Sequence, residues 1–449
     1  MVGLRIRRAL WSYLGVTGTC DMKRPNIIIL VIDTLREDHS QGLNRLSELG
    51  FVKYENAIAP APWTLPSHVS LITGLYPSQH GIHEGFSRTN EDLMHIATAG
   101  MSRLNYGLLG GLRDYEYTTH IITANPYLST KFGFKAYENV VVPGRFYSEK
   151  HLALYREWVG KYGRNRYVMF RDFVKNGRYV DAILGIIYSS MNVIEVLAHR
   201  LGVHDLSMEK GSRLITRIIE KRRFMEPFLL LINIMEAHSP YLPDDLDDVK
   251  YNNAISRWII DEYVNDPIIE RLRISYPRHA SLAVERAIGI VHALRPYLDN
   301  SLIIVTSDHG ELLGDGGLGH GYFLKDGLLK VPLWIRWPSG VKPPKQAGHY
   351  VSLTQIPSII NNVINGDEVR VGSDLALSES FGAPPYMDYS KATHEQLRKI
   401  FSHRVRVYTR GCIFTYNVSM EIIEEGNCEE GTAKEIIKNF ISLRPQPTT

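Results

Sequence analysis

Acidic and imidazole side chains collect directly after three apolar segments of this 449-residue chain. They are Asp33 after residues 26–32, Glu236 and His238 after residues 228–234, and Asp308 and His309 just beyond residues 301–306. In an open α/β sheet, ligands bind outside the carboxyl ends of the strands. A single Asp in such a place is more often the N-cap of the next helix. Three strand ends that all carry such residues favour a shared site.

The chemistry of this set is that of a metal site. Asp308 and His309 are adjacent, and a turn at the end of a strand lets both reach one ion, with Asp33 as a third ligand. A carboxylate beside an imidazole suits Zn²⁺ or Mn²⁺ better than Ca²⁺, which prefers oxygen ligands only. We therefore expect one divalent metal, Zn²⁺ or Mn²⁺, with Ca²⁺ or Mg²⁺ as alternatives.

A hydroxyl group stands at the start of a predicted helix in the segment "APWTLPSHVSLITGLYPSQHG". Pro66 suits the first helical turn, Thr64 lies just before it, and Gly74 is a typical C-terminal stop. His68 follows Thr64 by four residues and so shares its face of the helix. Thr64 is either an N-cap alone or a nucleophile that lies in the positive potential of a helix N-terminus and is activated by a metal. Patterning alone supports both interpretations.

The elements that must position these residues are short apolar runs separated by longer stretches with helical spacing. The runs are residues 26–32, 120–124, 228–234, 301–306 and 331–337, and helical spacing surrounds Leu71 and covers residues 280–298. Strands that alternate with helices predict an α/β fold with a mostly parallel sheet covered on both faces.

Composition limits the classes of function. Apolar residues make up 44% of the chain, and the net charge of +3 is too small to indicate a nucleic-acid partner. No apolar run is long enough to span a bilayer. The three cysteines, Cys20, Cys412 and Cys428, have no metal-ligand spacing. We expect three reduced thiols, with a Cys412–Cys428 bridge as the alternative.

Three regions differ from the alternating pattern. Residues 1–24 form a basic leader, which lacks the continuous apolar stretch and cleavage site of a signal peptide. The sequence therefore favours a cytoplasmic protein over a secreted or membrane-peripheral one. Residues 147–201 read as a helical insertion, interpreted as a solvated cap rather than a membrane or substrate-binding element. Residues 366–449 predict a small C-terminal α+β subdomain.

Taken together, these motifs resemble the sulfatase family within the alkaline-phosphatase-like superfamily. The residues that match the family signature are Thr64, Pro66, Ser67, His68, Leu71, Thr73, Gly74, Pro77 and Gly81. The segments "DTLR", "HSPYLP", "TSDHGE" and "GHGYFLKDGLLKVPLWI" follow in the family's order, and the resemblance covers residues 25–365. It implies a three-layer fold with a mostly parallel central sheet and a catalytic domain over these residues.

The resemblance also implies roles for individual residues. The implied metal ligands are Asp33, Thr64, Asp308 and His309, with Thr64 also the nucleophile. His238 and His320 would stabilise the transferred group or protonate its leaving oxygen, and His68 would lie beside the nucleophile. Lys325 is a candidate for the family's second anion-binding lysine. Glu236, His238 and His320 are the residues available for a second metal.

Departures from the signature change the expected reaction. Sulfatases oxidise a Cys or Ser to an aldehyde, and Thr64 cannot become that aldehyde. His68 replaces the family's Arg, Thr34 replaces an acidic residue, and His309 replaces Asn. A Thr nucleophile with an Asp-His pair resembles the phosphatases, phosphodiesterases and phosphoethanolamine transferases of the superfamily instead.

The sequence therefore predicts a metal-dependent hydrolase or phosphotransferase that acts on an anionic phosphoester through Thr64. One alternative is a sulfatase that acts without formylglycine. The other is a binding protein that kept the fold without catalysis, which the intact set of Asp33, Thr64, Asp308 and His309 opposes. The oligomeric state is not indicated by the sequence.

Overall fold

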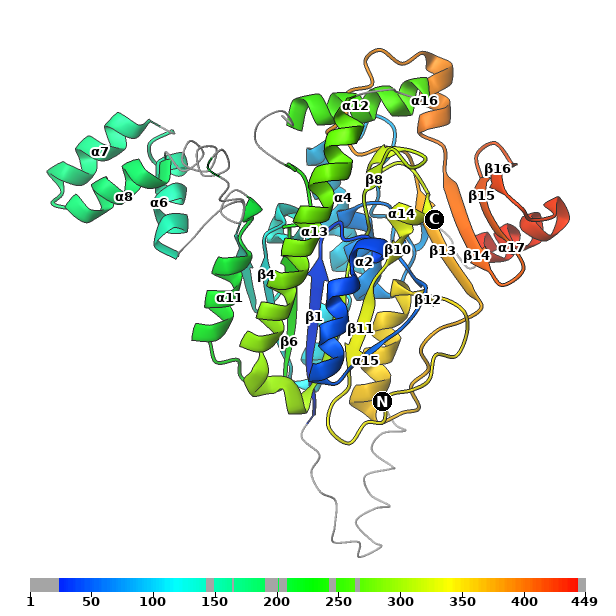
Figure 1. Cartoon of the computed structure of the whole chain (residues 1–449), viewed down its shortest axis with the longest axis horizontal. Helices are drawn as coiled ribbons and strands as arrows, with labels where there is room; N and C mark the ends of the chain where they lie inside the picture. The colour runs from blue at the N-terminus through cyan, green and yellow to red at the C-terminus, as the bar shows by residue number, and fades with distance from the viewer. Residues whose placement is uncertain are drawn as a thin grey trace, which may run out of the picture.

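A seven-stranded sheet forms the centre of the protein in the computed structural model, which describes residues 24–142, 149–163, 165–189, 201, 208–241, 248–262 and 267–442 (Figure 1). The strand order is β2-β11-β7-β1-β6-β4-β5. Five neighbouring strands run parallel: β7 (Ser301–Thr306), β1 (Asn26–Ile32), β6 (Phe228–Ile234), β4 (Thr118–Thr123) and β5 (Glu138–Val141). Their carboxyl ends therefore meet at one edge of the sheet.

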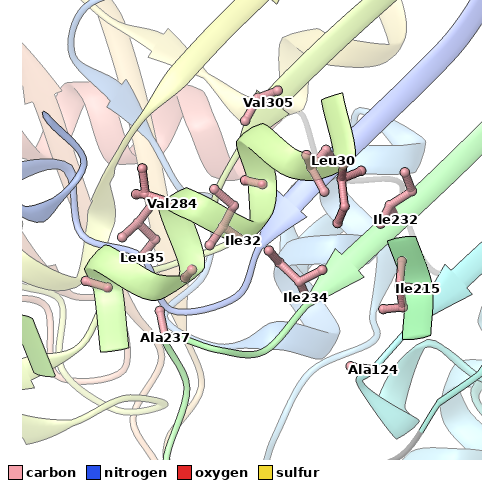
Figure 2. Packing of buried hydrophobic residues seen from close by; sticks show 14 of the residues in the cluster. Leu30, Ile32, Leu35, Ala124, Ile215, Ile232, Ile234, Ala237, Val284 and Val305 are labelled. Carbon is pink, nitrogen blue, oxygen red and sulfur yellow. The ribbon is translucent and has the colours of Figure 1, made fainter. Parts of the chain in front are cut away.

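Helices cover both faces of this sheet. Ile28, Leu30 and Ile32 of β1 pack on the face covered by α11 (Ser212–Lys221) and α13 (Ile268–Ala293), as the close-up of this cluster shows (Figure 2). The alternate residues Ile27, Ile29 and Val31 pack on the face covered by α2 (Thr64–Thr73), α4 (Asn90–Arg103) and α15 (Ile356–Asn365). Burying each such side chain contributes about 1.5–3 kcal/mol. The predicted three-layer α/β fold is confirmed.

The fifth predicted strand is divided in the structure. Residues 331–337 contribute to β10 (Lys330–Val331), which pairs with β3 (Ala57–Ile58), and to β11 (Leu333–Arg336), which runs antiparallel to β7 and to β2 (Phe51–Lys53). Pro332 separates the two pieces because it has no N–H to donate to a ladder. The prediction of one continuous strand was wrong at this position.

Two predicted helices have different ends in the structure. Helix α2 begins at Thr64 itself, and the N-cap residue is Trp63, so Thr64 is not the N-cap that the sequence suggested. Its predicted end at Gly74 is confirmed, with a left-handed backbone (φ 76°) that glycine adopts without strain. Helix α13 starts well before residue 280 and ends at Ala293, three residues before Pro296.

A second, antiparallel sheet forms the C-terminal part of the chain. Its strands are β13 (Leu375–Ser380), β14 (Arg404–Thr409), β15 (Ile413–Asn417) and β16 (Ile422–Gly426), and α16 (His394–Ile400) and α17 (Glu430–Ser442) complete this part. A disulfide joins Cys412 to Cys428. The prediction of three reduced thiols was therefore wrong for these two cysteines, and the alternative pairing is the one observed.

Several further helices and short strands lie outside these two sheets. They are α3 (Pro77–His80), α5 (Leu108–Gly111), α12 (Asp248–Asp261), α14 (Asp326–Leu329), β8 (Leu312–Leu313), β9 (Leu318–Gly319) and β12 (Val351–Ser352).

The region of the predicted insertion contains α6 (Glu149–Gly160), α7 (Arg166–Lys175) and α8 (Tyr179–Ser189). Residues 147–148, 164 and 190–200 of the insertion lie outside the described residues. So do residues 1–23 of the predicted leader, with Cys20, and residues 443–449 of the predicted C-terminal subdomain. Among the described helices, none combines the length and the apolar character needed to cross a bilayer.

Candidate active site

Three predicted ligands meet where β1 and β7 end. Asp33 directly follows β1, and Asp308 and His309 follow β7, which pairs with β1 in parallel register. One ligand atom from each residue lies within 4.8 Å of the other two. His309 Nε2 is 3.4 Å from Asp308 Oδ2 and 3.8 Å from Asp33 Oδ1. All three side chains are fully buried, so their charges face one another in a medium of low dielectric constant.

One oxygen of each carboxylate is committed to hydrogen bonds, and the other is not. Asp308 Oδ1 accepts from the backbone N–H groups of Thr34 (3.3 Å) and His309 (3.0 Å). Among the described residues, neither Asp33 Oδ1 nor Asp308 Oδ2 accepts a hydrogen bond, although both are buried. Two buried oxygens without donors are unfavourable for a protein alone, and a bound cation would satisfy both.

The imidazole of His309 is arranged as a metal ligand would be. Its Nδ1 lies 2.8 Å from the carbonyl oxygen of Gly310, so Nδ1 carries the proton and donates it. The lone pair of Nε2 therefore points at the two carboxylates. Burial, followed by the charge of His320, lowers the pKa of His309 to about 3, so the ring is neutral near pH 7. Asp33, Asp308 and His309 thus fit one divalent cation.

Without metal, the pKa values of Asp33 and Asp308 shift in opposite directions. Burial and the neighbouring charge of Asp33 raise the pKa of Asp308 well above its usual range. Burial also acts to raise the pKa of Asp33, but His238, His309 and His68 outweigh it and lower that pKa. One carboxylate of the pair therefore holds a proton more readily, as expected for like charges that share a site.

Thr64 presents its hydroxyl to this cluster. Its Oγ1 lies 3.4 Å from His309 Nε2 and accepts a hydrogen bond from Asn125 Nδ2 at 3.4 Å. As the first residue of α2, it lies at the positive end of a helix dipole, which favours negative charge on its oxygen. A cavity of about 280 Å³ opens over it, lined in part by Trp63, His238 and His320. Thr64 therefore presents a hydroxyl both to the carboxylate–histidine cluster and to this cavity.

His238 and His320 form the histidine wall of the cavity, with ring centroids 4.9 Å apart. His320 Nδ1 lies 3.0 Å from Glu311 Oε1, and Tyr241 donates its hydroxyl to the same carboxylate. Burial acts to lower the pKa of His320, but the charge of Glu311 outweighs it and raises that pKa. Burial lowers the pKa of His238. The two rings are thus suited to opposite proton-transfer roles.

His68 lies beneath Thr64, outside the lining of the cavity. Its Nδ1 is 2.9 Å from the carbonyl oxygen of Thr64 and 3.4 Å from Asp308 Oδ2, and its Nε2 faces Asn233 Nδ2 at 3.5 Å. Burial lowers its pKa, which keeps the ring neutral. The structure therefore places His68 where it holds the backbone of Thr64 and not where it would touch a substrate.

Lys325 and Glu236, which were predicted to bind the anion and a second metal, make other contacts in the structure. The ammonium of Lys325 pairs with Glu425 of β16 at 2.6 Å, and Lys325 does not line the cavity over Thr64. Glu236 Oε1 accepts from the backbone N–H groups of Lys210 and Ser212 at the start of α11. Among the described residues, Glu236 therefore does not join His238 and His320 in a second metal cluster.

Two asparagines of the site were not predicted. Asn125 Nδ2 and Asn233 Nδ2 both donate to Asp33 Oδ2, at 2.8 and 3.1 Å. Asn125 directly follows the predicted strand at residues 120–124, so the strand-end pattern that identified Asp33 also applies to it. Asn233 is the polar residue within the apolar run of β6, which is a second signal that the sequence carried.

Comparisons with known proteins identify the family of this chain. The model of the family described as Sulfatase matches residues 25–362. The chain belongs to the sulfatase family. A protein named Sulfatase from Formosa agariphila is 22% identical over 381 residues, which cover 76% of this chain and 69% of the relative. The Arylsulfatase of Clostridium perfringens is 21% identical over 390 residues, covering 78% of this chain and 76% of that protein.

Solved structures show the same fold. The phosphonate monoester hydrolase of Agrobacterium radiobacter superposes with a TM-score of 0.53 at 14% identity, covering 88% of each chain. A putative sulfatase from Bacteroides thetaiotaomicron superposes with a TM-score of 0.52 at 12% identity, covering 94% of this chain and 91% of that one. Members of the sulfatase family are hydrolases of anionic esters that bind a divalent metal, and this chain has a buried carboxylate–histidine cluster that could hold such an ion.

Proposed function

We propose that this sulfatase-family chain is a metal-dependent phosphoester hydrolase or phosphotransferase with Thr64 as its nucleophile. The observation that carries the proposal is the position of the Thr64 hydroxyl, 3.4 Å from His309 Nε2 at the mouth of a cluster with two unsatisfied carboxylate oxygens. A family member that works through an aldehyde needs an oxidisable Cys or Ser there. The threonine at this position supports direct attack by a hydroxyl oxygen.

The cluster supplies the ligands that this reaction needs. Asp33, Asp308 and His309 would hold the cation with Thr64, and Zn²⁺ or Mn²⁺ is favoured because one ligand is an imidazole. A bound divalent cation lowers the pKa of a neighbouring hydroxyl and neutralises charge on the transferred group. Asn125 fixes the direction of both Asp33 and Thr64, because its Nδ2 donates to each of them.

In the first step, the Thr64 hydroxyl gives its proton to solvent water and Thr64 Oγ1 bonds to phosphorus, while the bond from phosphorus to the leaving oxygen breaks. We assign His320 to protonate that oxygen, because Glu311 stabilises its charged form. In the second step, water or an acceptor alcohol attacks the phospho-Thr64 ester, the bond from phosphorus to Thr64 Oγ1 breaks, and that oxygen takes up a proton from solvent water. We assign neutral His238 to accept the proton of the attacking group, because burial favours its uncharged form.

The proposal is tested by turnover of matched esters by purified protein supplied with Zn²⁺ or Mn²⁺. Aryl phosphate, phosphodiester, phosphonate and sulfate esters with the same leaving group are compared side by side. We expect a phosphorus ester to have the highest kcat/KM, and Thr64→Ala to lose all measurable turnover. Thr64→Ser is the matched control, because it keeps the attacking hydroxyl and is expected to keep partial activity.

Covalent labelling tests the assignment of the nucleophile separately from the assignment of the substrate class. A rapid quench with ³³P-labelled phosphate ester should leave label on the peptide that contains Thr64, and Thr64→Ala should leave none. A preference for the sulfate ester would overturn the phosphoester assignment and favour a sulfatase that acts without formylglycine. Full activity of Thr64→Ala would overturn the nucleophile.

A further inference from the structure

Each exposed side chain that the structure describes on α8 is aliphatic or aromatic. Tyr179, Val180, Ile183, Ile186 and Ile187 are between 39 and 69% exposed. Their spacing of three, four and seven residues places them on one side of the helix. A solvent-exposed helix face ordinarily carries charged or polar residues, and a contiguous apolar patch on a surface indicates an interaction site.

Helix α7 extends this apolar surface. Tyr167, Phe170 and Val174 follow one another at spacings of three and four residues and are between 37 and 88% exposed. By helical geometry, Arg171 and Lys175 lie directly beside this stripe. The two helices thus carry an apolar surface with a basic margin, which we name the hairpin surface and define by the eight apolar residues above with Arg171 and Lys175.

The hairpin surface is not an uncovered part of the main core. Met169 and Phe173 of α7 pack with Ala182 of α8 in a separate small core, and a Cβ added at Gly185 would meet Met169 Cε at 2.9 Å. The two helices therefore face each other through small and large residues that fit closely. Figure 1 shows α6, α7 and α8 as a group beside the body of the protein. The exposed apolar residues are on the outside of this group.

Charge gives the hairpin surface a preferred partner. Residues 149–189 contain eight Lys and Arg and four Asp and Glu, a net charge of +4 in a chain whose total is +3. Three of the acids are held by internal ion pairs: Glu157 with Arg178, Asp172 with Lys161, and Asp181 with Lys150 and Arg178. Within the described part of the chain, no acidic side chain pairs with Arg171 or Lys175. The positive charge is therefore available to an anionic partner.

The insertion also starts at the edge of the sheet that carries the site. It follows β5, which is parallel to β4, β6 and β1, and it leads into the N-terminus of α11 before β6. Chain that leaves the carboxyl end of β5 is on the side where Asp33 and Asp308 lie. A partner bound to the hairpin surface would therefore lie on the side of the sheet that carries the active site (Figure 1).

We propose that the hairpin surface docks on the anionic surface of a lipid bilayer. Aromatic and branched aliphatic side chains would enter the headgroup and acyl boundary, and Arg171 and Lys175 would contact lipid phosphates. A second copy of this chain is the less suitable occupant, because two surfaces of net positive charge repel one another. The proposal does not depend on the reaction catalysed, since docking is a property of α7 and α8 alone.

Flotation of the full-length protein with vesicles tests the proposal. We expect binding to vesicles of equal phosphatidylglycerol and phosphatidylcholine, at least tenfold weaker binding to phosphatidylcholine alone, and release as salt is raised. The double variant Ile183→Glu/Ile187→Glu should lose binding, and Arg171→Gln/Lys175→Gln should weaken it severalfold. Ile274→Glu, an exposed isoleucine of α13, is the matched control and should bind as the unchanged protein does.

Circular dichroism and thermal unfolding establish that each variant is folded before flotation. Absence of binding to phosphatidylglycerol vesicles by the unchanged protein would overturn the proposal. Equal binding by Ile183→Glu/Ile187→Glu would overturn it as well, because another surface would then be responsible. Sedimentation that shows self-association, abolished by Ile183→Glu/Ile187→Glu, would assign the surface to a second copy instead.

Discussion

Replacing Asp308 by Asn should stabilise the metal-free protein and abolish its response to metal. Asp308 Oδ2 and Asp33 Oδ1 are buried near each other without hydrogen-bond donors. In the variant, the Oδ1 atom still accepts from Thr34 and His309, and an amide N–H takes the place of Oδ2. That amide can donate to Asp33 without taking up a proton, so at pH values where both carboxyl groups are ionised a repulsive pair becomes a hydrogen bond to a charged group.

The magnitudes follow from these contacts. A hydrogen bond to a charged group contributes about 1.5–3 kcal/mol. With an unfolding entropy of about 2.1 cal/mol/K per residue, that energy corresponds to roughly 2–3 °C in Tm for a chain of this length. Metal at a hundred times its Kd stabilises the unchanged protein by about 2.7 kcal/mol, which again corresponds to about 3 °C. Asp308→Asn should therefore raise the Tm of the metal-free protein, and added metal should not raise the Tm of this variant further.

Thermal unfolding followed by circular dichroism, with EDTA or with Zn²⁺, measures both effects. Asp367→Asn removes an exposed carboxylate far from the cluster in sequence and serves as the control, with a metal response like that of the unchanged protein. If Asp308→Asn kept the full metal-induced rise in Tm, the assignment of this carboxylate as a ligand would be refuted. A large loss of metal-free stability would refute the repulsion argument.

The pH dependence of metal-free stability has a defined sign. Because burial and Asp33 raise the pKa of Asp308 above its unfolded value of 3.8, its contribution is full below that value and is lost as pH rises through the folded pKa. The EDTA-treated protein should therefore lose part of its stability with rising pH. Metal-loaded protein should show the opposite trend, because ligands must be deprotonated to bind. Asp308→Asn should flatten both curves.

Three further predictions concern neighbours of the site and the second sheet. Asn125→Ala should lower kcat about 10²-fold or more in the ester assay with a smaller change in KM, because the Thr64 hydroxyl loses the group that orients it. Glu84→Gln should cost about 1–3 kcal/mol in urea unfolding, because one amide oxygen cannot accept from both Trp63 Nε1 and the N–H of Phe381. Cys412→Ser should cost about 3 kcal/mol in the same assay, because the bridge closes a loop of sequence separation 16. Unchanged kcat in the first case, or unchanged unfolding midpoints in the others, would contradict these expectations.

The central strands could be predicted because both faces of the sheet are covered. A strand such as β1 or β6 is buried on both sides and appears as a continuous apolar run. The direction of β11 could not be predicted in this way, since an antiparallel strand under the same helices has the same apolar composition. The break at Pro332 was visible in the sequence, because proline has no ladder donor.

The candidate metal ligands could be predicted from the sequence, whereas the contacts of neighbouring residues could be predicted less well. The end of a strand fixes where Asp33 and Asp308 lie, because neighbouring parallel strands end at the same edge. The end of a strand does not fix the orientation of a side chain. Glu236 follows β6 as Asp308 follows β7, but its carboxylate accepts a hydrogen bond at the N-terminus of α11. The ion pair of Lys325 with Glu425 joins residues 100 positions apart, and spacing in the sequence does not reveal such a contact.

The assembly of the cluster from β1 and β7 has a consequence for synthesis and truncation. Asp33 and Asp308 are separated by most of the catalytic part of the chain. Of the asparagines that orient Asp33, Asn233 lies in β6, next to β1, and Asn125 follows β4, one strand further away. A nascent chain therefore cannot complete the cluster of Asp33, Asp308 and His309 until β7 has emerged from the ribosome and joined the sheet. Any fragment that ends before residue 308 should lack this site, so metal affinity at the site reports completion of the sheet.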